Sequence, residues 1–300
     1  MFALTILGSN SAIPAFGRNP TAQILQTEDN SFLIDCGEGA QSQLARYKLR
    51  NNKLSHIFIS HLHGDHYFGL IGLLTSMSLL SRTQELHVYG PTQLEQIINC
   101  QLEAGEVRLS YPIHFHSLTE EGMIACTNKI EISCIKMQHR IECWGFLFRE
   151  KKNPRSVEPE KAKAFEIPLS YYEQLKKGED YITKSGTVIP NHEVTSPNAP
   201  PRTYAYCADT LYNESVVEKI KGIDLLYHET TYLKDQPQKA MDRYHSTTVQ
   251  AANIAKLAGV KQLIIGHFSS KYENLDAFLT ETKEVFENTS LAIEGSCYKI

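Results

Sequence analysis

The segment His61-Leu62-His63-Gly64-Asp65-His66 places four side chains with metal-binding chemistry within one short stretch. Imidazole and carboxylate groups are ligands that zinc selects in proteins. The segment follows the strand-like run His56–Ser60 and precedes an apolar helical pattern over Tyr67–Ser81, which predicts a strand-to-helix turn that Gly64 allows to close. Ordinary packing gives no reason for three histidines and an aspartate at these offsets, so we interpret the turn as a metal-binding motif.

One turn cannot complete a metal site, and further ligands are expected at the ends of other strands. Three candidates each directly follow an apolar, strand-like run: His139 after Ile130–Met137, Asp209 after Thr203–Ala208, and His267 after Gln262–Gly266. Loops at one end of packed sheets are where such residues gather. Seven ligands are too many for one tetrahedral zinc and suit two metal ions. Asp209, with two carboxylate oxygens, is the natural bridge between them.

The elements that must position these ligands alternate between strands and helices in both halves of the chain. Further strands are expected at Phe2–Gly8, Thr21–Gln26, Ser31–Asp35, Glu85–Tyr89, Asp224–His228 and Leu291–Glu294. Further helices are expected from Gly39 to about Leu49, from Pro91 to Gly105, from Asn213 to Lys221, over Ser246–Ala258, and from Asn274 to about Glu287. This order predicts an α/β protein with two β-sheets packed on each other and helices on the outer faces.

Composition narrows the class of protein. At 300 residues, with 42% hydrophobic residues, the chain can form one large domain with an insertion, or two fused halves. Neither a signal peptide nor an apolar run of about 18 residues is present, which predicts a cytoplasmic protein without a membrane partner. The seven cysteines form no CxxC pair and are expected to be buried thiols. A formal charge of -4 argues mildly against a general nucleic-acid binder.

The segment from about Arg149 to Arg202 departs from the strand and helix pattern. It contains seven prolines, many charged residues and little apolar periodicity. We therefore interpret residues 150–201 as an arm inserted into a domain that covers residues 1–300. Between Arg149 and Lys184 there are nine basic and seven acidic residues, a field too weak for long-range attraction of a polyanion.

The ligand motif, together with His139, Asp209 and His267, resembles the metallo-β-lactamase superfamily, and narrower motifs resemble ribonuclease Z. These narrower motifs are Leu7-Gly8-Ser9, Arg18-Asn19-Pro20-Thr21-Ala22, Asp35-Cys36-Gly37-Glu38-Gly39, Ala208-Asp209-Thr210, His228-Glu229-Thr230-Thr231-Tyr232, His245-Ser246-Thr247 and Gly266-His267-Phe268-Ser269-Ser270-Lys271-Tyr272. They cover nearly the whole chain in order. The resemblance implies an αββα sandwich with a protruding arm, a precursor transfer RNA (tRNA) substrate and a homodimer.

The same resemblance implies a ligand assignment. One metal would be held by His61, His63 and His139, and a second by Asp65, His66 and His267, with Asp209 bridging them. The cofactors would be two Zn²⁺ ions per chain, with Mn²⁺ as the alternative. Asp35 would be a partner that orients the ligand loop.

A mechanism of phosphodiester cleavage follows from these expectations. A water that bridges two zinc ions loses its proton near neutral pH and attacks phosphorus, while Asp65 holds or accepts that proton. Cleavage leaves a 3′-hydroxyl on the tRNA and a 5′-phosphate on the trailer. His245 is the candidate proton donor to the leaving oxygen, with Glu229 as an acidic partner that keeps it charged. A phosphate is expected to rest on Ser246 and Thr247 at a helix N-terminus.

Further substrate contacts are expected outside the metal site. Lys176 and Lys177, beside Gly178 in the arm, are candidates for phosphate contacts, and Tyr171 and Tyr172 for RNA contacts. Two departures from the family pattern bear on these contacts with the tRNA. Lys271 stands where the family usually has arginine, which weakens a bidentate phosphate contact, and the arm lacks the usual Gly-Pro pair.

Two other functions compete with this interpretation. A small-molecule hydrolase or a cyclic-nucleotide phosphodiesterase can use the same metal centre, but a small substrate needs no inserted arm. A catalytically silent RNA-binding subunit is a different class of protein, and intact ligands at all seven positions argue against it.

Overall fold

The computed structural model describes residues 1–49 and 53–300 and separates into two compact units. The larger unit consists of Met1–Arg149 and Arg202–Ile300, and the smaller one of Glu150–Pro201. The smaller unit occupies the segment in which the sequence analysis placed an arm, and we call it the arm.

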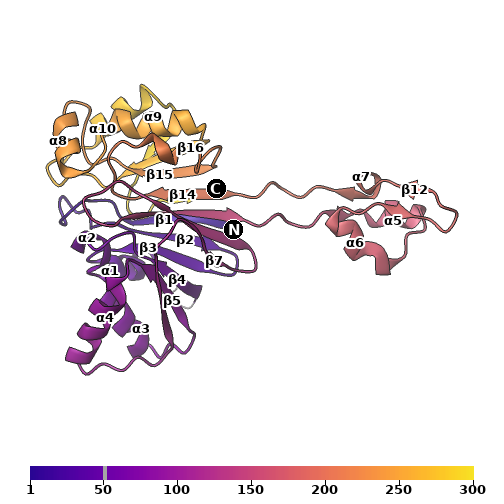
Figure 1. The fold of residues 1–300 in the computed structure, drawn as a ribbon, viewed down its shortest axis with the longest axis horizontal. Helices are drawn as coiled ribbons and strands as arrows, with labels where there is room; N and C mark the ends of the chain where they lie inside the picture. The colour runs from indigo at the N-terminus through magenta and orange to yellow at the C-terminus, as the bar shows by residue number, and fades with distance from the viewer. Residues whose placement is uncertain (50–52) are drawn as a thin grey trace. The chain divides into compact units, whose positions relative to one another are not determined.

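Two mixed seven-stranded sheets form the larger unit (Figure 1). In spatial order, the first sheet contains β18 (Cys297–Lys299), β1 (Phe2–Gly8), β2 (Ala22–Thr27), β3 (Ser31–Cys36), β4 (Leu54–Phe58), β5 (Leu86–Gly90) and β6 (Ile113–Ser117). The second contains β17 (Thr289–Leu291), β16 (Gln262–Gly266), β15 (Leu225–Glu229), β14 (Thr203–Cys207), β9 (Trp144–Glu150), β8 (Ile130–Lys136) and β7 (Gly122–Cys126). Strands β3 to β6 run parallel, as do β14 to β17, so within each set the carboxyl ends lie along one edge of the sheet.

Helices cover the outer faces of the two sheets (Figure 1). They are α1 (Ala40–Arg46), α2 (Gly64–Tyr67), α3 (Leu70–Leu79), α4 (Gln93–Ala104), the 3₁₀ helix η3 (Glu214–Val216), α8 (Pro237–Arg243), α9 (Thr248–Ala258) and α10 (Asp276–Lys283). None of the described helices is long and apolar enough to span a bilayer. The architecture confirms the predicted sandwich of two sheets with outer helices.

The core lies between the sheets and also beneath the outer helices, because each sheet is packed on both faces. Between the sheets, the ring of Phe58 contacts those of Phe146 and Phe148, at centroid distances of 5.3 and 5.4 Å. A second layer, which includes Leu33, Ile57 and Val88, joins the first sheet to α1, α3 and α4. Burial on both faces explains why the central strands are nearly continuous apolar runs.

Several predicted boundaries were wrong. The helix expected over Tyr67–Ser81 is two helices, of which the first begins at Gly64. The strand expected at Leu291–Glu294 lies earlier, as β17 (Thr289–Leu291), and the carboxylate of Glu294 accepts hydrogen bonds from Asn19 and Gln43. Asn213 caps only the short η3, and its side chain accepts from the amide of Ser215.

The arm has its own small core. Its elements are β10 (Ser156–Val157), α5 (Pro159–Ala164), the 3₁₀ helix η2 (Leu169–Tyr171), α6 (Tyr172–Lys177), β11 (Tyr181–Ile182), β12 (Val188–Ile189), α7 (Asn191–Val194) and β13 (Thr195–Ser196). The buried core residues are Ala162, Ile167, Leu175, Ile189 and Val194. The arm is therefore an ordered unit, although its sequence shows little apolar periodicity. Its helices and strands are too short for a periodic pattern to be visible in the sequence.

All seven cysteines are free thiols, but they are not all buried as predicted. Cys36, Cys134, Cys143 and Cys207 are buried, whereas Cys100, Cys126 and Cys297 are exposed. In the sequence, the exposed cysteines stand among apolar residues just as the buried ones do. The sequence alone therefore indicated burial for all seven.

Candidate metal centre

The ligand motif lies at the carboxyl end of β4, where the chain turns into α2. The other sheet contributes His139 after β8, Asp209 after β14 and His267 after β16. Close backbone approach brings the motif into place: a Cβ on Gly37 would lie 2.3 Å from the carbonyl oxygen of Asp65. The loops therefore meet where carboxyl ends of strands from both sheets come together.

The structure brings all seven predicted ligands together in two groups. The first contains His61, His63, His139 and Asp209, and the second contains Asp65, His66 and His267. Within each group, the ligand atoms lie within 4.8 Å of one another. They line a cleft of about 770 Å³ or lie directly beneath it.

The histidine nitrogens of the centre face one another. Nε2 of His61 lies 2.9 Å from Nδ1 of His63, and Nδ1 of His63 lies 3.2 Å from Nε2 of His139. In the second group, Nε2 of His66 and Nε2 of His267 are 3.2 Å apart. Zinc–nitrogen bonds of about 2.0–2.1 Å place two ligands of one tetrahedral ion at about this separation.

Asp209 faces both groups with its two carboxylate oxygens. Its Oδ2 lies 3.6 Å from Nε2 of His61 and 3.5 Å from Nε2 of His66, so this oxygen stands between the groups, while its Oδ1 lies 3.2 Å from Nε2 of His267. Asp209 is buried, and within the described chain Oδ1 has no hydrogen-bond partner, which is costly for a carboxylate unless a cation binds it. This arrangement fits a bridging ligand between two metal ions.

The charge of the centre also fits metal ions. Burial alone would lower the pKa of His66, but the carboxylates of Asp209, Asp65 and Asp35 outweigh it and raise that pKa well above its usual value. The three carboxylates therefore favour a positive charge beside the His66 ring, as a metal cation would supply. Burial lowers the pKa of His61 and His63, which keeps them in the neutral form that ligates metals.

Partners outside the ligand set fix which nitrogen of each histidine faces the centre. Nδ1 of His66 lies 2.7 Å from Asp35, as predicted for this residue, and Asp35 also accepts from Ser60 and from the hydroxyl of Tyr206. Nδ1 of His139 donates to the carbonyl of Tyr244. These bonds leave Nε2 free to bind a metal ion.

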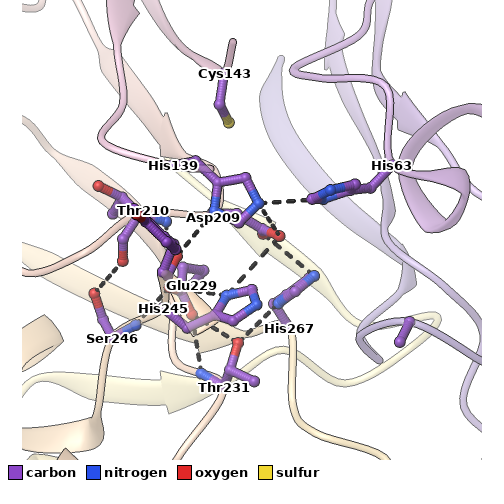
Figure 2. A network of polar contacts seen from close by, with 12 residues as sticks. His63, His139, Cys143, Asp209, Thr210, Glu229, Thr231, His245, Ser246 and His267 are labelled. Carbon is purple, nitrogen blue, oxygen red and sulfur yellow. Dashed lines mark hydrogen bonds and ion pairs between the residues drawn. The ribbon is translucent and has the colours of Figure 1, made fainter. Parts of the chain in front are cut away.

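The ligand His267 is part of a hydrogen-bonded chain that ends at Glu229, which in turn forms an ion pair with His245 (Figure 2). Nδ1 of His267 donates to the hydroxyl of Thr231, which donates to Oε2 of Glu229 at 2.8 Å. Oε1 of Glu229 lies 3.4 Å from Nδ1 of His245. Burial acts to lower the pKa of His245, but Glu229 and Asp209 outweigh it and raise that pKa to about 9. His245 is therefore positioned as a charged proton donor, with the partner expected from the sequence.

The backbone is strained around these groups. Asp35 and His267 have φ angles of 55° and 61°, in the left-handed region that non-glycine residues seldom occupy. Ala12 and Tyr244 share this conformation, with φ angles of 61° and 60°, and both contact the centre through backbone atoms. The amide of Ala12 donates to Oδ2 of Asp65 at 2.7 Å. Such strain persists where the surrounding structure holds a functional geometry.

The sequence analysis missed Ala12, Thr231 and Tyr244. Tyr244 and Ala12 act through backbone atoms, which their residue types do not reveal. Thr231 could have been found from the sequence, because it follows Glu229 by two residues within the motif His228-Glu229-Thr230-Thr231-Tyr232.

The helix-terminus site predicted for phosphate is engaged by the protein itself. The amide of Ser246 donates to Oε1 of Glu229 at 2.6 Å, and its hydroxyl donates to the carbonyl of Thr210. The helix begins at Thr248, and Thr247 caps it: the Thr247 amide donates to the side chain of Gln250, whose amide donates back to the Thr247 hydroxyl. Ser246 and Thr247 thus contact Glu229 and the start of the helix, and phosphate binding by these two residues stays a prediction.

The remaining predicted contacts lie away from the centre. Lys271 is exposed with its ammonium group 5.6 Å from the centre of the Tyr272 ring, and the cleft is lined by the preceding Ser269 and Ser270 instead. In the arm, Lys176 and Lys177 form the last turn of α6, which Gly178 ends with a φ of 97°.

The arm tyrosines predicted to contact RNA pack in part against the arm core. Tyr171 and Tyr172 are half-buried there, and their contact with RNA stays a prediction. The hydroxyl of Tyr171 donates to the carbonyl of Asp180, and its ring contacts that of Tyr181 edge-on.

Comparisons with known proteins agree with the fold and the centre. The structure superposes on the metallo-β-lactamase fold protein YhfI from Bacillus subtilis with a TM-score of 0.70, at 20% identity and full coverage of both chains. The short form of human tRNase Z gives a TM-score of 0.74 at 26% identity, with 99% of each chain covered. The fold and the seven converging ligands thus define a metallo-β-lactamase-fold protein.

The sequence comparisons define the family more narrowly. Residues 2–154 match the family model described as "Anti-Pycsar protein Apyc1", a range that ends before Asp209, His245 and His267. Ribonuclease Z of Bacteroides thetaiotaomicron is 44% identical over 100% of this chain and 95% of its own length. The chain belongs to the ribonuclease Z family, and its N-terminal half to the domain family of that model.

Proposed function

We propose that this chain is an endoribonuclease that cleaves precursor tRNA at its 3′ side, leaving a 3′-hydroxyl on the tRNA and a 5′-phosphate on the trailer. The observation that carries the proposal is the convergence of seven metal ligands beside a charged His245, in a chain that is 44% identical to a ribonuclease Z over its whole length. The arm, with its own core, supports a large substrate over a small one.

The cofactors we propose are two Zn²⁺ ions per chain. His61, His63 and His139 would hold one, Asp65, His66 and His267 the other, and Asp209 would bind both. Such ions supply Lewis acidity, which activates water and neutralises charge on a phosphate.

The residues around the ligands carry the proton transfers. Asp65 accepts a hydrogen bond from the amide of Ala12, which orients its carboxylate towards the cleft, where it can accept the proton of the attacking water. On the leaving side, His245 is kept protonated by Glu229 and donates its proton to the 3′-oxygen as that oxygen departs. Glu229 is itself held by the amides of Thr231 and Ser246, so the donor has a fixed orientation.

We propose that the arm contacts the tRNA away from the cleavage point. Lys176 and Lys177 line an arm cavity of about 580 Å³ together with Lys152, Arg155 and His192. A concave basic surface of this kind suits phosphate groups of an RNA backbone. The homodimer and the cytoplasmic location expected from the sequence stay predictions.

The deciding experiment combines substrate mapping with metal analysis. Zinc-loaded protein should cut a precursor tRNA once, at its 3′ side, and give the two end groups named above. Elemental analysis should find about two zinc ions per chain. The variant Asp209→Ala should lose metal from both positions and lose turnover. Random cleavage of the RNA would contradict the proposed substrate, and full metal retention in Asp209→Ala would contradict the bridge.

A further inference from the structure

A tyrosine of the second sheet lies in the core between the sheets with its ring held on both sides. Tyr206 on β14 is 1% exposed, and its ring stacks on that of Tyr227 at a centroid distance of 5.1 Å and on that of Phe146 at 6.4 Å. Both residues are also its register partners, Tyr227 on β15 and Phe146 on β9. The ring of Tyr206 therefore has little freedom to move.

The hydroxyl of Tyr206 crosses to the first sheet, where it donates to Asp35 at the end of β3. It lies 2.6 Å from Oδ2 of Asp35. Burial, together with Asp35, raises the pKa of Tyr206 well above its usual value, so the hydroxyl keeps the proton that it donates. Phenylalanine would fill the same apolar space without the cost of burying a hydroxyl, which indicates a use for this polar group.

The same carboxylate oxygen contacts a metal ligand. Oδ2 of Asp35 lies 2.7 Å from Nδ1 of His66, and Nε2 of the His66 ring faces the second ligand group. The other oxygen, Oδ1, accepts from the amide of Ser60 at 2.7 Å. Because Tyr206 and His66 meet at one oxygen, the fixed hydroxyl of Tyr206 helps to set the position of the His66 ring.

The first ligand group is one contact further from this carboxylate. The hydroxyl of Ser60 donates to Asp35 at 2.9 Å and lies 3.0 Å from Nδ1 of His61, whereas His66 contacts Asp35 directly. Asp35 also has a φ of 55°, a strained conformation that depends on the contacts around it. Loss of one bond to Asp35 should therefore affect the second ligand group first.

We propose that Tyr206 is a positioning residue of the metal centre, which acts through Asp35 on His66 and strengthens binding of the ion held by the second ligand group. This proposal rests on the two-metal cofactor of the proposed function. Strand β14 ends two residues before Asp209, so one strand of the second sheet both leads to the bridging ligand and supports a ligand of the opposite sheet.

The same strand offers a matched control two residues earlier. Tyr204 is as buried as Tyr206, and its hydroxyl also crosses to the first sheet, where it donates to Oε1 of Gln23 on β2. Tyr204→Phe and Tyr206→Phe each remove one hydroxyl and one hydrogen bond between the sheets. Of these two variants, Tyr206→Phe is the one that removes a bond to Asp35.

The measurement is zinc retention by each zinc-loaded protein during titration with a chelator. In Tyr206→Phe, the affinity for one of the two ions should fall about 10- to 100-fold, and Tyr204→Phe should follow the parent. The denaturation midpoints of the metal-free variants should shift by similar amounts, because both variants lose a buried hydrogen bond. A purely structural role of Tyr206 would shift its midpoint and leave zinc retention unchanged.

A double variant tests the route through Asp35. If Tyr206 acts through that carboxylate, Asp35→Ala combined with Tyr206→Phe should retain zinc as Asp35→Ala alone does, because the support is already lost. The proposal would be overturned by equal zinc retention in Tyr206→Phe and Tyr204→Phe, by tighter binding in Tyr206→Phe, or by an additional loss in the double variant. A parent protein that fails to bind two ions would contradict the proposed cofactors, and this proposal with them.

Discussion

His245 and Glu229 form a pair in which each carries the charge that the other needs. Burial opposes both charges, but His245 lowers the pKa of Glu229 while Glu229 raises that of His245. The pair sits 3.9 Å from Asp209 through Nδ1 of His245, so the proton donor is coupled directly to the bridging ligand. His245 also stands with Asp209 and His267 in a group whose possible ligand atoms lie within 4.8 Å of one another, so metal content must be measured together with activity.

The variant His245→Ala should keep its metal ions and lose about 10²- to 10⁴-fold of its precursor tRNA cleavage rate, the usual effect of removing a general acid. A nitrophenolate leaving group needs no proton, so nitrophenyl diester hydrolysis should fall far less. Both rates and the metal content are to be measured on the same preparation. An equal loss on both substrates would show that His245 positions the phosphate rather than protonating the leaving group.

At this scale the sequence predicted side chains much better than backbone contacts. The seven ligands were predictable because histidine and aspartate directly after apolar strands have few other uses. The carbonyl of Tyr244 and the amide of Ala12 were not, because any residue type can supply them and only the folded loops bring them to His139 and Asp65.

Helix α9 shows how one element supports the centre from outside it. Its capping box ties Thr247 to Gln250, and the Thr248 amide donates to the carbonyl of Tyr232 in the loop after β15. The hydroxyl of Thr248 donates to Glu281 on α10. The start of α9 therefore fixes the loop that presents His245.

The variant Thr247→Ala should lower the free energy of unfolding by about 1 kcal/mol, because it removes the N-cap hydroxyl. The KM for a nitrophenyl diester should stay close to the parental value, since the Thr247 side chain is engaged in capping the helix. Chemical denaturation and steady-state kinetics measure the two effects. Thr247→Ser is the control that retains the hydroxyl and should restore stability. A several-fold rise in KM without loss of stability would instead support phosphate binding by Thr247.

Element boundaries were less predictable than element types. The long apolar run after His66 indicated one helix, and the chain divides it because Gly69 must approach the carbonyl of Gly37, 2.2 Å from where a Cβ would stand. Near the C-terminus, the sequence indicated a strand over Leu291–Glu294, but the strand ends at Leu291 and Glu294 is hydrogen-bonded to Asn19, 275 residues earlier. Such long-range contacts override a local pattern.

On the scale of the whole molecule, histidine protonation links stability to pH. The pKa of His56 in the folded protein is about 4, below the value of about 6.5 that an unfolded chain has. The neutral His56 ring therefore makes its full contribution to the free energy of unfolding above about pH 6.5. This contribution is lost as the pH falls towards about 4.

The variant His56→Phe should keep the ring packing against Phe58 and flatten this pH dependence. Between pH 6.5 and 4 the parent should lose on the order of 2 kcal/mol more of its unfolding free energy than the variant does. Denaturation curves at several pH values test this, with His192→Ala as a control that leaves the slope unchanged. Parallel curves for the parent and His56→Phe would exclude His56 as the group responsible.

The arm contains none of the seven candidate metal ligands, so its proposed role in substrate binding can be tested separately from the metal centre. Replacing Lys151–Pro200 with a short Gly/Ser linker should leave zinc content and nitrophenyl diester hydrolysis nearly unchanged, because all seven ligands lie in the larger unit. For precursor tRNA, kcat/KM should fall about 10²-fold or more, mainly through KM, since remote contacts supply positioning energy. Processing at the parental kcat/KM would exclude the arm as a substrate-binding element.

The arm leaves the second sheet and returns to it through two neighbouring strands. Arg149 on β9 and Thr203 on β14 are register partners in one antiparallel ladder, so the insertion leaves the sandwich and returns to it at neighbouring positions. A segment bounded in this way can be lengthened, shortened or exchanged for another recognition module without shifting the register of either sheet. The catalytic body can therefore acquire new substrates through changes confined to one continuous stretch of the sequence, while its ligands stay where they are.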